Sequence, residues 1–312
     1  MKDFKHMLGA LVGVLASASS VQASTSYTPV QFRTVSGIRP FVQVQLNGKP
    51  FLFMVHANAG FYMMTTHANA AAAGVTNLVE LDNYGISSIG HLSGLGRAKV
   101  VLPQLRVAGE KFTDVPLLVF EVPQDPPMQG MLGIGWLRAS RVVLDYNRSR
   151  LALPESPQDS RKEDQSLIAE GYVAHPMIWD EKNNAYFVHA TVDGVAVDMN
   201  VSTVAENMLD IEFARSAGIA VGPAIAEYGG PKGSTGEVFI AKKPVSITIN
   251  GQKTAPGQPH ILDSYAYDSE ERKPDPDANH LARIGADFML ANQAVIDFGT
   301  NTLFIPGEKD VN

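Results

Sequence analysis

The chain has 312 residues, enough for two domains of ordinary size, and 45% hydrophobic with 18% charged residues is typical of a folded globular protein. A formal net charge of −7 argues against a general nucleic-acid-binding protein, because such a protein needs a basic face against the phosphates. The chain has no cysteine, so disulfides, thiolate metal sites and cysteine nucleophiles are excluded.

The first 23 residues have the features of a secretory signal peptide. Lys2 and Lys5 precede a short apolar stretch, and Ala23 completes a small-residue cleavage site. The stretch is too short and too broken by Gly and Ser to span a bilayer as a stable helix, and an uncleaved anchor is the alternative. We therefore expect a periplasmic or secreted bacterial protein that has no membrane contact after cleavage.

A hairpin and a short helix open the mature chain. Alternating residues at 41–46 predict a half-buried strand, and the apolar run 51–55 predicts a strand buried on both faces. Asn47-Gly48 between them suits a two-residue hairpin turn, since both residues tolerate positive φ. The segment 66–74 predicts a short helix that ends at a glycine.

The same pattern recurs in the second half of the chain. Alternating residues at 186–192, the turn Asp193-Gly194 and a further apolar strand repeat the first hairpin, and 211–218 predicts the matching helix. An internal duplication of this kind predicts two similar lobes that face each other across a cleft, where ligands commonly bind.

The two copies also end alike. Residues 130–154 (GMLGIGWLRASRVVLDYNRSRLALP) and 282–306 (ARIGADFMLANQAVIDFGTNTLFIP) each pass from an apolar–Gly pair through a short helix to a strand, a turn and a last strand. Asp145 and Asp297 stand just before these turns, where aspartate commonly accepts backbone hydrogen bonds. We interpret both as structural residues.

Polar segments separate the copies and interrupt the second one. Residues 155–170 lack strand alternation and are interpreted as an exposed linker, and 268–280 as a surface loop. The expected fold is mainly β, with two duplicated β-barrel-like lobes that each carry a short helix. The expected divisions are a signal peptide (1–23), an N-terminal lobe (24–154), a linker (155–183) and a C-terminal lobe (184–312).

This set of hairpins, helices and closing signatures resembles the two-copy, retropepsin-like and pepsin-like bacterial aspartic peptidases. In that family a hairpin leads into Asp-Thr-Gly, a helix ending in glycine follows, and an apolar-apolar-Gly signature with a final hairpin closes each lobe. The resemblance covers about 38–154 and 184–306. It implies a bilobal acid-protease-like fold in which the glycine-rich segments 94–99 and 228–236 belong to flaps over the cleft; phosphate binding there is the alternative.

The catalytic motif of that family is degenerate in both copies. His56 stands at the catalytic position of the first copy. In the second copy, counting on from the turn glycine places Ser202 there, whereas counting back from the helix-ending glycine places Asn200 there. Neither register supplies an aspartate. The residues that the resemblance then places in the cleft are Ala57, Asn58, Ala59, Thr203, Val204 and Ala205.

Loss of both acids predicts loss of the family's chemistry. In that mechanism two nearby carboxyl groups share a proton and activate a water molecule. We therefore expect an exported protein without aspartic-type catalysis that binds an extended peptide or protein segment in the cleft. No histidine spacing typical of a metal site occurs, so no metal or cofactor is expected.

Two alternatives remain open from the sequence. One is a hydrolase in which His56 and Ser202 meet across the cleft, and it also needs an orienting carboxylate and an oxyanion hole. The other is a structural or docking protein whose cleft is closed.

Overall fold

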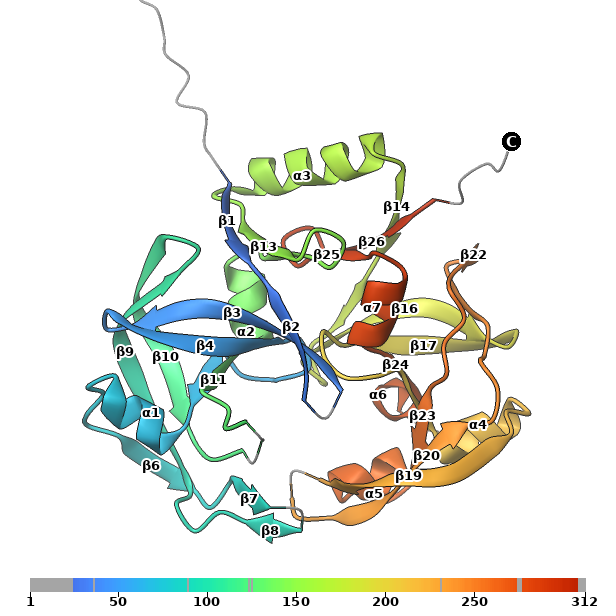
Figure 1. Ribbon diagram of the computed structural model, residues 1–312, viewed down its shortest axis with the longest axis horizontal. Helices are drawn as coiled ribbons and strands as arrows, with labels where there is room; N and C mark the ends of the chain where they lie inside the picture. The colour runs from blue at the N-terminus through green and yellow to red at the C-terminus, as the bar shows by residue number, and fades with distance from the viewer. Residues whose placement is uncertain are drawn as a thin grey trace, which may run out of the picture.

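The computed structural model describes residues 25–307 except 36, 89, 123, 125, 231 and 274–276. The expected signal peptide at 1–23 lies outside the described residues. Two β-rich lobes stand side by side beneath a shared sheet and a covering helix (Figure 1). Across the described ranges, none of the helices combines the length and the apolar character that a membrane crossing requires.

The N-terminal lobe is one curled sheet with two short helices. Its elements are β2 (Gln31–Thr34), β3 (Ile38–Leu46), β4 (Lys49–His56), β5 (Met63–Thr65), α1 (His67–Ala72), β6 (Val79–Asp82), β9 (Arg97–Val107), β10 (Glu110–Val119), β11 (Gly130–Gly133) and α2 (Ile134–Ala139). The strand order is β2-β3-β4-β11-β5-β10-β9-β6, and an additional pairing of β3 with β9 curls the sheet around a core that includes Phe53, Leu102 and Trp136.

The predicted hairpin and helix of the first copy are confirmed. Asn47 and Gly48 have φ values of 48° and 81°, as a two-residue hairpin turn requires. Thr66 caps α1 by accepting a hydrogen bond from Asn69 N, and Gly74 follows the helix with a φ of 70°.

The C-terminal lobe repeats this plan. Its elements are β15 (Ile178–Asp180), β16 (Ala185–Val192), β17 (Val195–Val201), β18 (Met208–Asp210), α4 (Ile211–Ser216), β19 (Val221–Gly229), β20 (Thr235–Ala241), β21 (Ile247–Ile249), β22 (Gln252–Lys253), β23 (His260–Leu262), α5 (Ser264–Asp268), α6 (Ala278–Leu281), β24 (Ala282–Ile284) and α7 (Ala286–Ala291). The order is β19-β20-β23-β18-β24-β17-β16-β21-β22, with β15 paired to β16. Asp193 and Gly194 have φ values of 47° and 84°, which confirms the second turn.

A third sheet joins the lobes and contains both closing segments. Its strands are β1 (Ser26–Pro29), β12 (Val143–Asp145), β13 (Arg150–Leu153), β14 (Tyr172–Pro176), β25 (Val295–Asp297) and β26 (Thr302–Pro306), in the order β1-β13-β12-β25-β26-β14. The lobes meet where β12 pairs antiparallel with β25 and Val143 lies opposite Asp297. The relative placement of the lobes is therefore fixed by backbone hydrogen bonds.

Residues 155–170, expected to be an exposed linker, form the helix α3 (Pro157–Ala169) over the shared sheet (Figure 1). Ser156 caps the helix by accepting a hydrogen bond from Asp159 N, and Pro157 occupies the first turn. Leu167 packs with Phe304 and other residues of the sheet. The expectation rested on the lack of strand alternation and overlooked this cap, which precedes a helix whose buried apolar residue is Leu167.

Two hairpins extend over the space between the lobes and meet at their tips (Figure 1). One runs from β6 to β9 and carries β7 (Ile86–Ser88) and β8 (His91–Leu92), and the other is β19–β20, whose tip contains most of the segment 228–236. The two tips are in contact. If Gly90 carried a side chain, its Cβ atom would lie 3.0 Å from Thr235 Cγ2, and a Cβ atom at Gly233 would lie 3.9 Å from Leu92 Cδ2. The two lobes thus touch at the hairpin tips as well as in the shared sheet.

Candidate functional site

Strand pairing aligns the degenerate motifs of the two copies. The parallel pair β4–β11 places Gly133 of the closing signature opposite His56. The parallel pair β17–β24 places the residue before the matching glycine opposite Val201. Because the two signature glycines are equivalent, Ser202 rather than Asn200 occupies the position that corresponds to His56.

Thr203 braces the two motif loops against each other. Its buried Oγ1 accepts a hydrogen bond from Ala57 N at 2.9 Å and donates to Val55 O at 2.8 Å. Tyr146, beneath the loops, donates from its hydroxyl to Thr203 O at 2.9 Å. The equivalent residue of the first copy, Ala57, has no hydroxyl. The C-terminal lobe therefore supplies the brace through Thr203, and the N-terminal lobe supplies no matching side-chain hydroxyl.

Asn58 supplies contacts on the side that lacks the hydroxyl. The orientation of its amide is assigned from its neighbours: Nδ2 donates to Val201 O at 3.0 Å, and Oδ1 accepts from Arg283 Nε at 3.3 Å. The amide of Asn58 also contacts the amide of Asn200 across the lobes. Amide side chains therefore connect the two loops beside His56 and Ser202.

His56 is a neutral imidazole at the midline, the place where the two motif loops meet. Burial, together with the positive charges of Arg39 and Arg283, lowers the pKa of His56 to about 3. Its Nδ1 is buried, and no described residue forms a hydrogen bond with that atom. At neutral pH the midline therefore carries no negative charge from either motif position.

Ser202 is oriented toward its own loop. Its Oγ donates to Val204 O and accepts from Val204 N, both at 3.2 Å, and the residue is 1% exposed. His56 and Ser202 both belong to the described chain, and no hydrogen bond joins them. The nucleophile–base contact that a serine hydrolase requires is thus not formed in this structure.

Two acidic side chains lie close to these loops, both in the C-terminal lobe. A Cβ built on Gly37 would lie 2.5 Å from Glu206 Oε2, so this carboxylate packs against the turn before β3. Asp287 Oδ1 accepts from Asn207 N and Phe288 N, and burial raises the pKa of Asp287. No hydrogen bond joins these two described carboxyl groups, and neither occupies a motif position.

The structure buries most of the residues expected to line the cleft. Asn58 and Ala205 keep partial exposure. Ala205 also takes the left-handed conformation of its loop, with a φ of 62°, which spares the β-branched Val204 this strain. The buried residues of this set are Ala57, Ala59, Thr203 and Val204.

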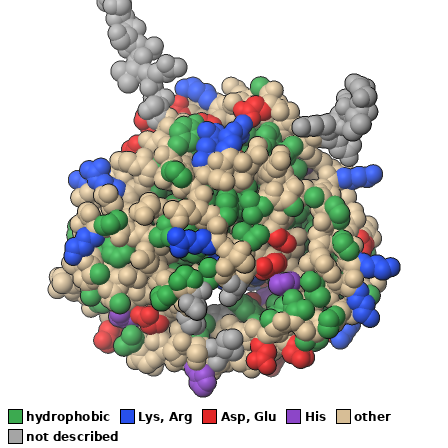
Figure 2. All heavy atoms as spheres, in the orientation of Figure 1, with side chains coloured by type: hydrophobic (Ala, Val, Ile, Leu, Met, Phe, Trp, Pro, Cys, Tyr) green, Lys and Arg blue, Asp and Glu red, His purple; other side chains and the backbone are tan. Residues whose placement is uncertain are grey.

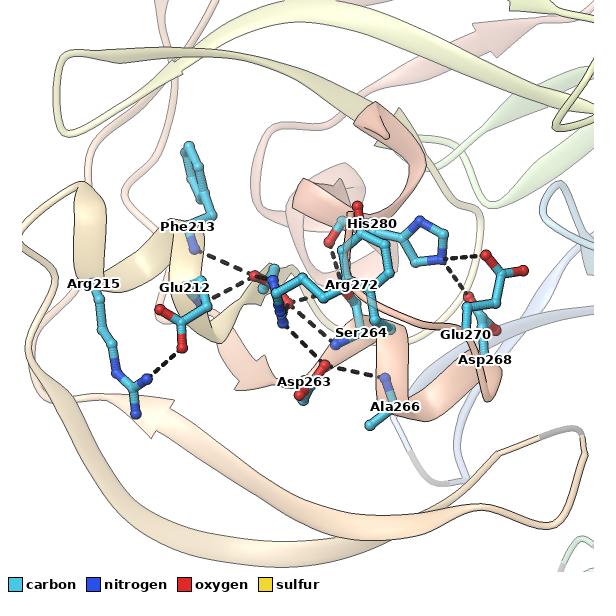
Figure 3. A network of polar contacts seen from close by, with 12 residues as sticks. Glu212, Phe213, Arg215, Asp263, Ser264, Ala266, Asp268, Glu270, Arg272 and His280 are labelled. Atoms are coloured by element: carbon cyan, nitrogen blue, oxygen red, sulfur yellow. Dashed lines mark hydrogen bonds and ion pairs between the residues drawn. The ribbon is translucent and has the colours of Figure 1, made fainter. Parts of the chain in front are cut away.

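A polar network connects α4, α5 and α6 of the C-terminal lobe (Figure 3). Asp210 is fully buried and receives both guanidinium nitrogens of Arg272, at 2.7 and 2.8 Å, and Ser264 Oγ at 2.9 Å. Burial alone would raise the pKa of Asp210, but these hydrogen bonds outweigh it and lower the pKa. His280 stacks on Tyr265 in the same network.

This network corrects the expectation that 268–280 is only a surface loop. Arg272 holds the buried carboxylate, α6 begins at Ala278, and His280 is 5% exposed. The sequence looked loop-like because these anchors are polar residues separated by proline and acidic residues.

The face between the lobes is hollowed, with Asp, Glu and His side chains on the edge formed by the C-terminal lobe (Figure 2). A separate polar pocket lies between β1, β13 and α3, but its charged groups pair with one another, as in Arg148–Glu170 and Lys162–Asp159. Within the described ranges, no three His, Asp or Glu side chains gather in a way suited to a metal ion.

Sequence reasoning missed the two arginines near His56. Arg283 occupies the closing signature ARIGADF, where the first copy has Met131 in GMLGIGW, so a charge in an apolar signature was a usable signal. Arg39 opens the apolar alternation of β3 and carried no comparable signal, because its approach to His56 depends on the tertiary fold.

No model of a known protein family matches this chain, and no curated protein does. Among solved structures, the aspartic proteinase from Irpex lacteus matches with a TM-score of 0.52 and 9% identity, over 91% of this chain and 97% of that one. Conglutin gamma, a basic 7S globulin from lupine seeds, matches with a TM-score of 0.46 and 12% identity, over 91% and 95%. A retropepsin-like aspartic protease from Rickettsia conorii matches with a TM-score of 0.29 and 18% identity, over 42% and 92%. The chain thus has the mainly β, bilobal aspartic-protease-like fold that the sequence predicted.

Proposed function

We propose that this protein is an exported, non-catalytic variant of the aspartic-protease fold that binds an extended peptide or protein segment between its lobes. The observation that carries the proposal is the midline itself. The Thr203 brace between the loops is in place, while His56 and Ser202 stand at the positions of the two acids. A neutral imidazole and a serine hydroxyl cannot share a proton as two carboxyl groups do.

The binding part of the proposal is supported by β6 and β19, which are the edge strands of their sheets and belong to the two hairpins over the cleft (Figure 1). An extended chain can add to such edges through main-chain hydrogen bonds, and this needs no catalytic acid. The tips that carry Gly90 and Thr235 touch, so a ligand enters when these tips separate. The competing hydrolase is disfavoured by the hydrogen bonds of Ser202 Oγ to Val204 rather than to His56.

Binding is tested by locking the two tips together. The chain has no cysteine, so Gly90→Cys with Thr235→Cys introduces one possible disulfide at a place where the two positions already touch. The purified double variant is immobilised and exposed to a random dodecapeptide library, once reduced and once oxidised. We expect peptides to be enriched on the reduced form and excluded from the oxidised form.

The reduced form is the matched control, because it differs from the locked form by a single covalent bond. No enrichment on the reduced form or on the parent protein would contradict the proposal. Equal enrichment on both forms would place binding outside the cleft. Cleaved peptides in the eluate would favour the hydrolase instead.

A further inference from the structure

The charge at the midline is the reverse of that in a catalytic aspartic peptidase. Arg39, from β3 of the N-terminal lobe, and Arg283, from β24 of the C-terminal lobe, both act electrostatically on His56. Two cationic groups therefore act on His56, which stands at the position where the resemblance would place one of the two acids.

The charge of Arg39 is balanced within the chain. Its Nε donates to Val35 O at 2.5 Å, and the carboxylate of Glu206 attracts its guanidinium. Burial lowers the pKa of Arg39, and the Glu206 carboxylate opposes that effect. Arg39 thus contributes positive potential, but its side chain is already held in place.

The charge of Arg283 is not balanced in this way. This half-buried side chain offers Nε to Asn58 Oδ1 at 3.3 Å, and no carboxylate of the described chain forms an ion pair with it. The equivalent residue of the first copy is Met131, since Arg283 lies opposite Asn200 as Met131 lies opposite Met54. Because this guanidinium is partly shielded from water and has no anionic partner among the described residues, the site favours a carboxylate from outside the chain.

The polar groups near this guanidinium are neutral. Asn58 and Asn200 form the amide chain between the motif loops, and Nδ1 of His56 is buried without a partner among the described residues. An anion placed here can receive a charge-assisted hydrogen bond from Arg283. The carboxyl groups of Glu206 and Asp287, both in the C-terminal lobe, repel further negative charges on that side. The edge of this lobe along the hollow carries Asp, Glu and His side chains (Figure 2).

We propose that the segment bound between the lobes presents one acidic side chain to Arg283 at the midline. This inference rests on the proposed function and adds the ligand's chemistry to it. The ligand is then an extended peptide with a single central Asp or Glu, because acids placed elsewhere meet the acidic edge of the C-terminal lobe.

The library selection on the parent protein reads this out directly. We expect the enriched peptides, once aligned, to carry Asp or Glu at one position only. Enrichment of peptides without a common acid would overturn this inference and leave the proposed function standing. No enrichment at all would overturn both, so the two failures are distinguishable.

The role of Arg283 is tested with Arg283→Met, which introduces the side chain found at the equivalent position of the first copy. The control is Arg106→Gln, which removes one positive charge from an exposed position on β9. Three peptide probes are used. The first is an enriched peptide with blocked ends, and the second is the same peptide with its acidic residue changed to Gln or Asn. The third is the second peptide shortened so that this Gln or Asn is its last residue, which places a free C-terminal carboxylate there instead of an acidic side chain.

We expect the change of the peptide's acid to an amide to weaken binding to the parent and to Arg106→Gln by about tenfold or more. The same peptide change should weaken binding to Arg283→Met by less than about twofold. An unchanged acid preference in Arg283→Met would overturn the assignment. If the peptide with the free C-terminal carboxylate bound the parent more tightly than the peptide with the internal acid, the anion would come from a chain end, and the assignment to a side chain would be overturned.

Discussion

Asp297, a buried residue of the shared sheet, and Asp164, a half-buried residue of α3, form a pair of neighbouring acids. Asp297 is fully buried, and its Oδ1 accepts from Gly299 N at 2.6 Å and from Thr300 N at 3.0 Å. Its Oδ2 and Asp164 Oδ1 are both buried and have no hydrogen-bond partner among the described residues. Burial, followed by the negative charge of Asp164, raises the pKa of Asp297 to about 7. The two carboxyl groups therefore hold one proton between them near neutral pH.

This pair makes stability depend on pH in a defined direction. The folded chain keeps the proton up to about pH 7, whereas the unfolded chain releases it near the ordinary pKa of 3.8. Stability is therefore lost as pH rises from about 4 to about 7, with an upper limit of roughly 4 kcal/mol for a shift of this size. Asp297→Asn removes the ionisation and lets an amide N–H donate to Asp164. We expect this variant to be roughly 2–4 kcal/mol more stable than the parent at pH 8.

Urea unfolding of parent and variant at pH 5 and pH 8 measures this difference. The control is Asp145→Asn, the equivalent residue of the first copy, whose carboxylate instead accepts hydrogen bonds from Arg148 and Arg150. That variant should be less stable than the parent at pH 8, by about 1–3 kcal/mol. Loss of stability in Asp297→Asn at pH 8, or a gain equal at both pH values, would refute the reasoning.

Three further changes test the midline and its supports. Thr203→Val removes two hydrogen bonds between the lobes and leaves buried backbone groups unpaired, so urea unfolding should show a loss of about 3 kcal/mol, and a loss below about 1 kcal/mol would contradict the brace. Arg272→Met leaves the Asp210 carboxylate buried without its cation and should cost about 3 kcal/mol at pH 7. Because the folded-state pKa of Asp210 is lowered, that deficit should shrink as pH falls below about 4, and a constant deficit would argue against an electrostatic origin. The pKa of His56 is lowered to about 3, so its ring proton resonances should not titrate between pH 8 and pH 4.5, and a midpoint near 6.5 would contradict its burial.

The duplicated elements could be predicted because their signals are local. Asn47-Gly48 and Asp193-Gly194 take the positive φ values that two-residue turns require, whatever surrounds them. The pairing of β12 with β25 could not be predicted in the same way, because nothing in either strand specifies a partner in the other lobe. α3 was missed because a helix with one buried leucine resembles a polar linker in composition.

The candidate site was predictable in position but not in charge. The loops at His56 and Ser202 could be found by counting from the turns, and strand pairing then aligned them. Arg39 reaches the midline from a different strand, and the approach of Asn58 to Arg283 is a contact across the lobes. Such convergence depends on tertiary structure, so the sequence predicted the loss of two acids without predicting the cations nearby.

The central claim is that no pair of carboxyl groups activates a water molecule at the midline. A cleavage assay tests this claim most directly. Purified protein is incubated with a diverse peptide pool from pH 3 to pH 8, and mass spectrometry scores new termini, with His56→Ala and Ser202→Ala in parallel. The expected result is no cleavage above background at any pH in all three proteins. Cleavage by the parent that either variant abolishes, or that a transition-state mimic of peptide hydrolysis blocks, would contradict the account.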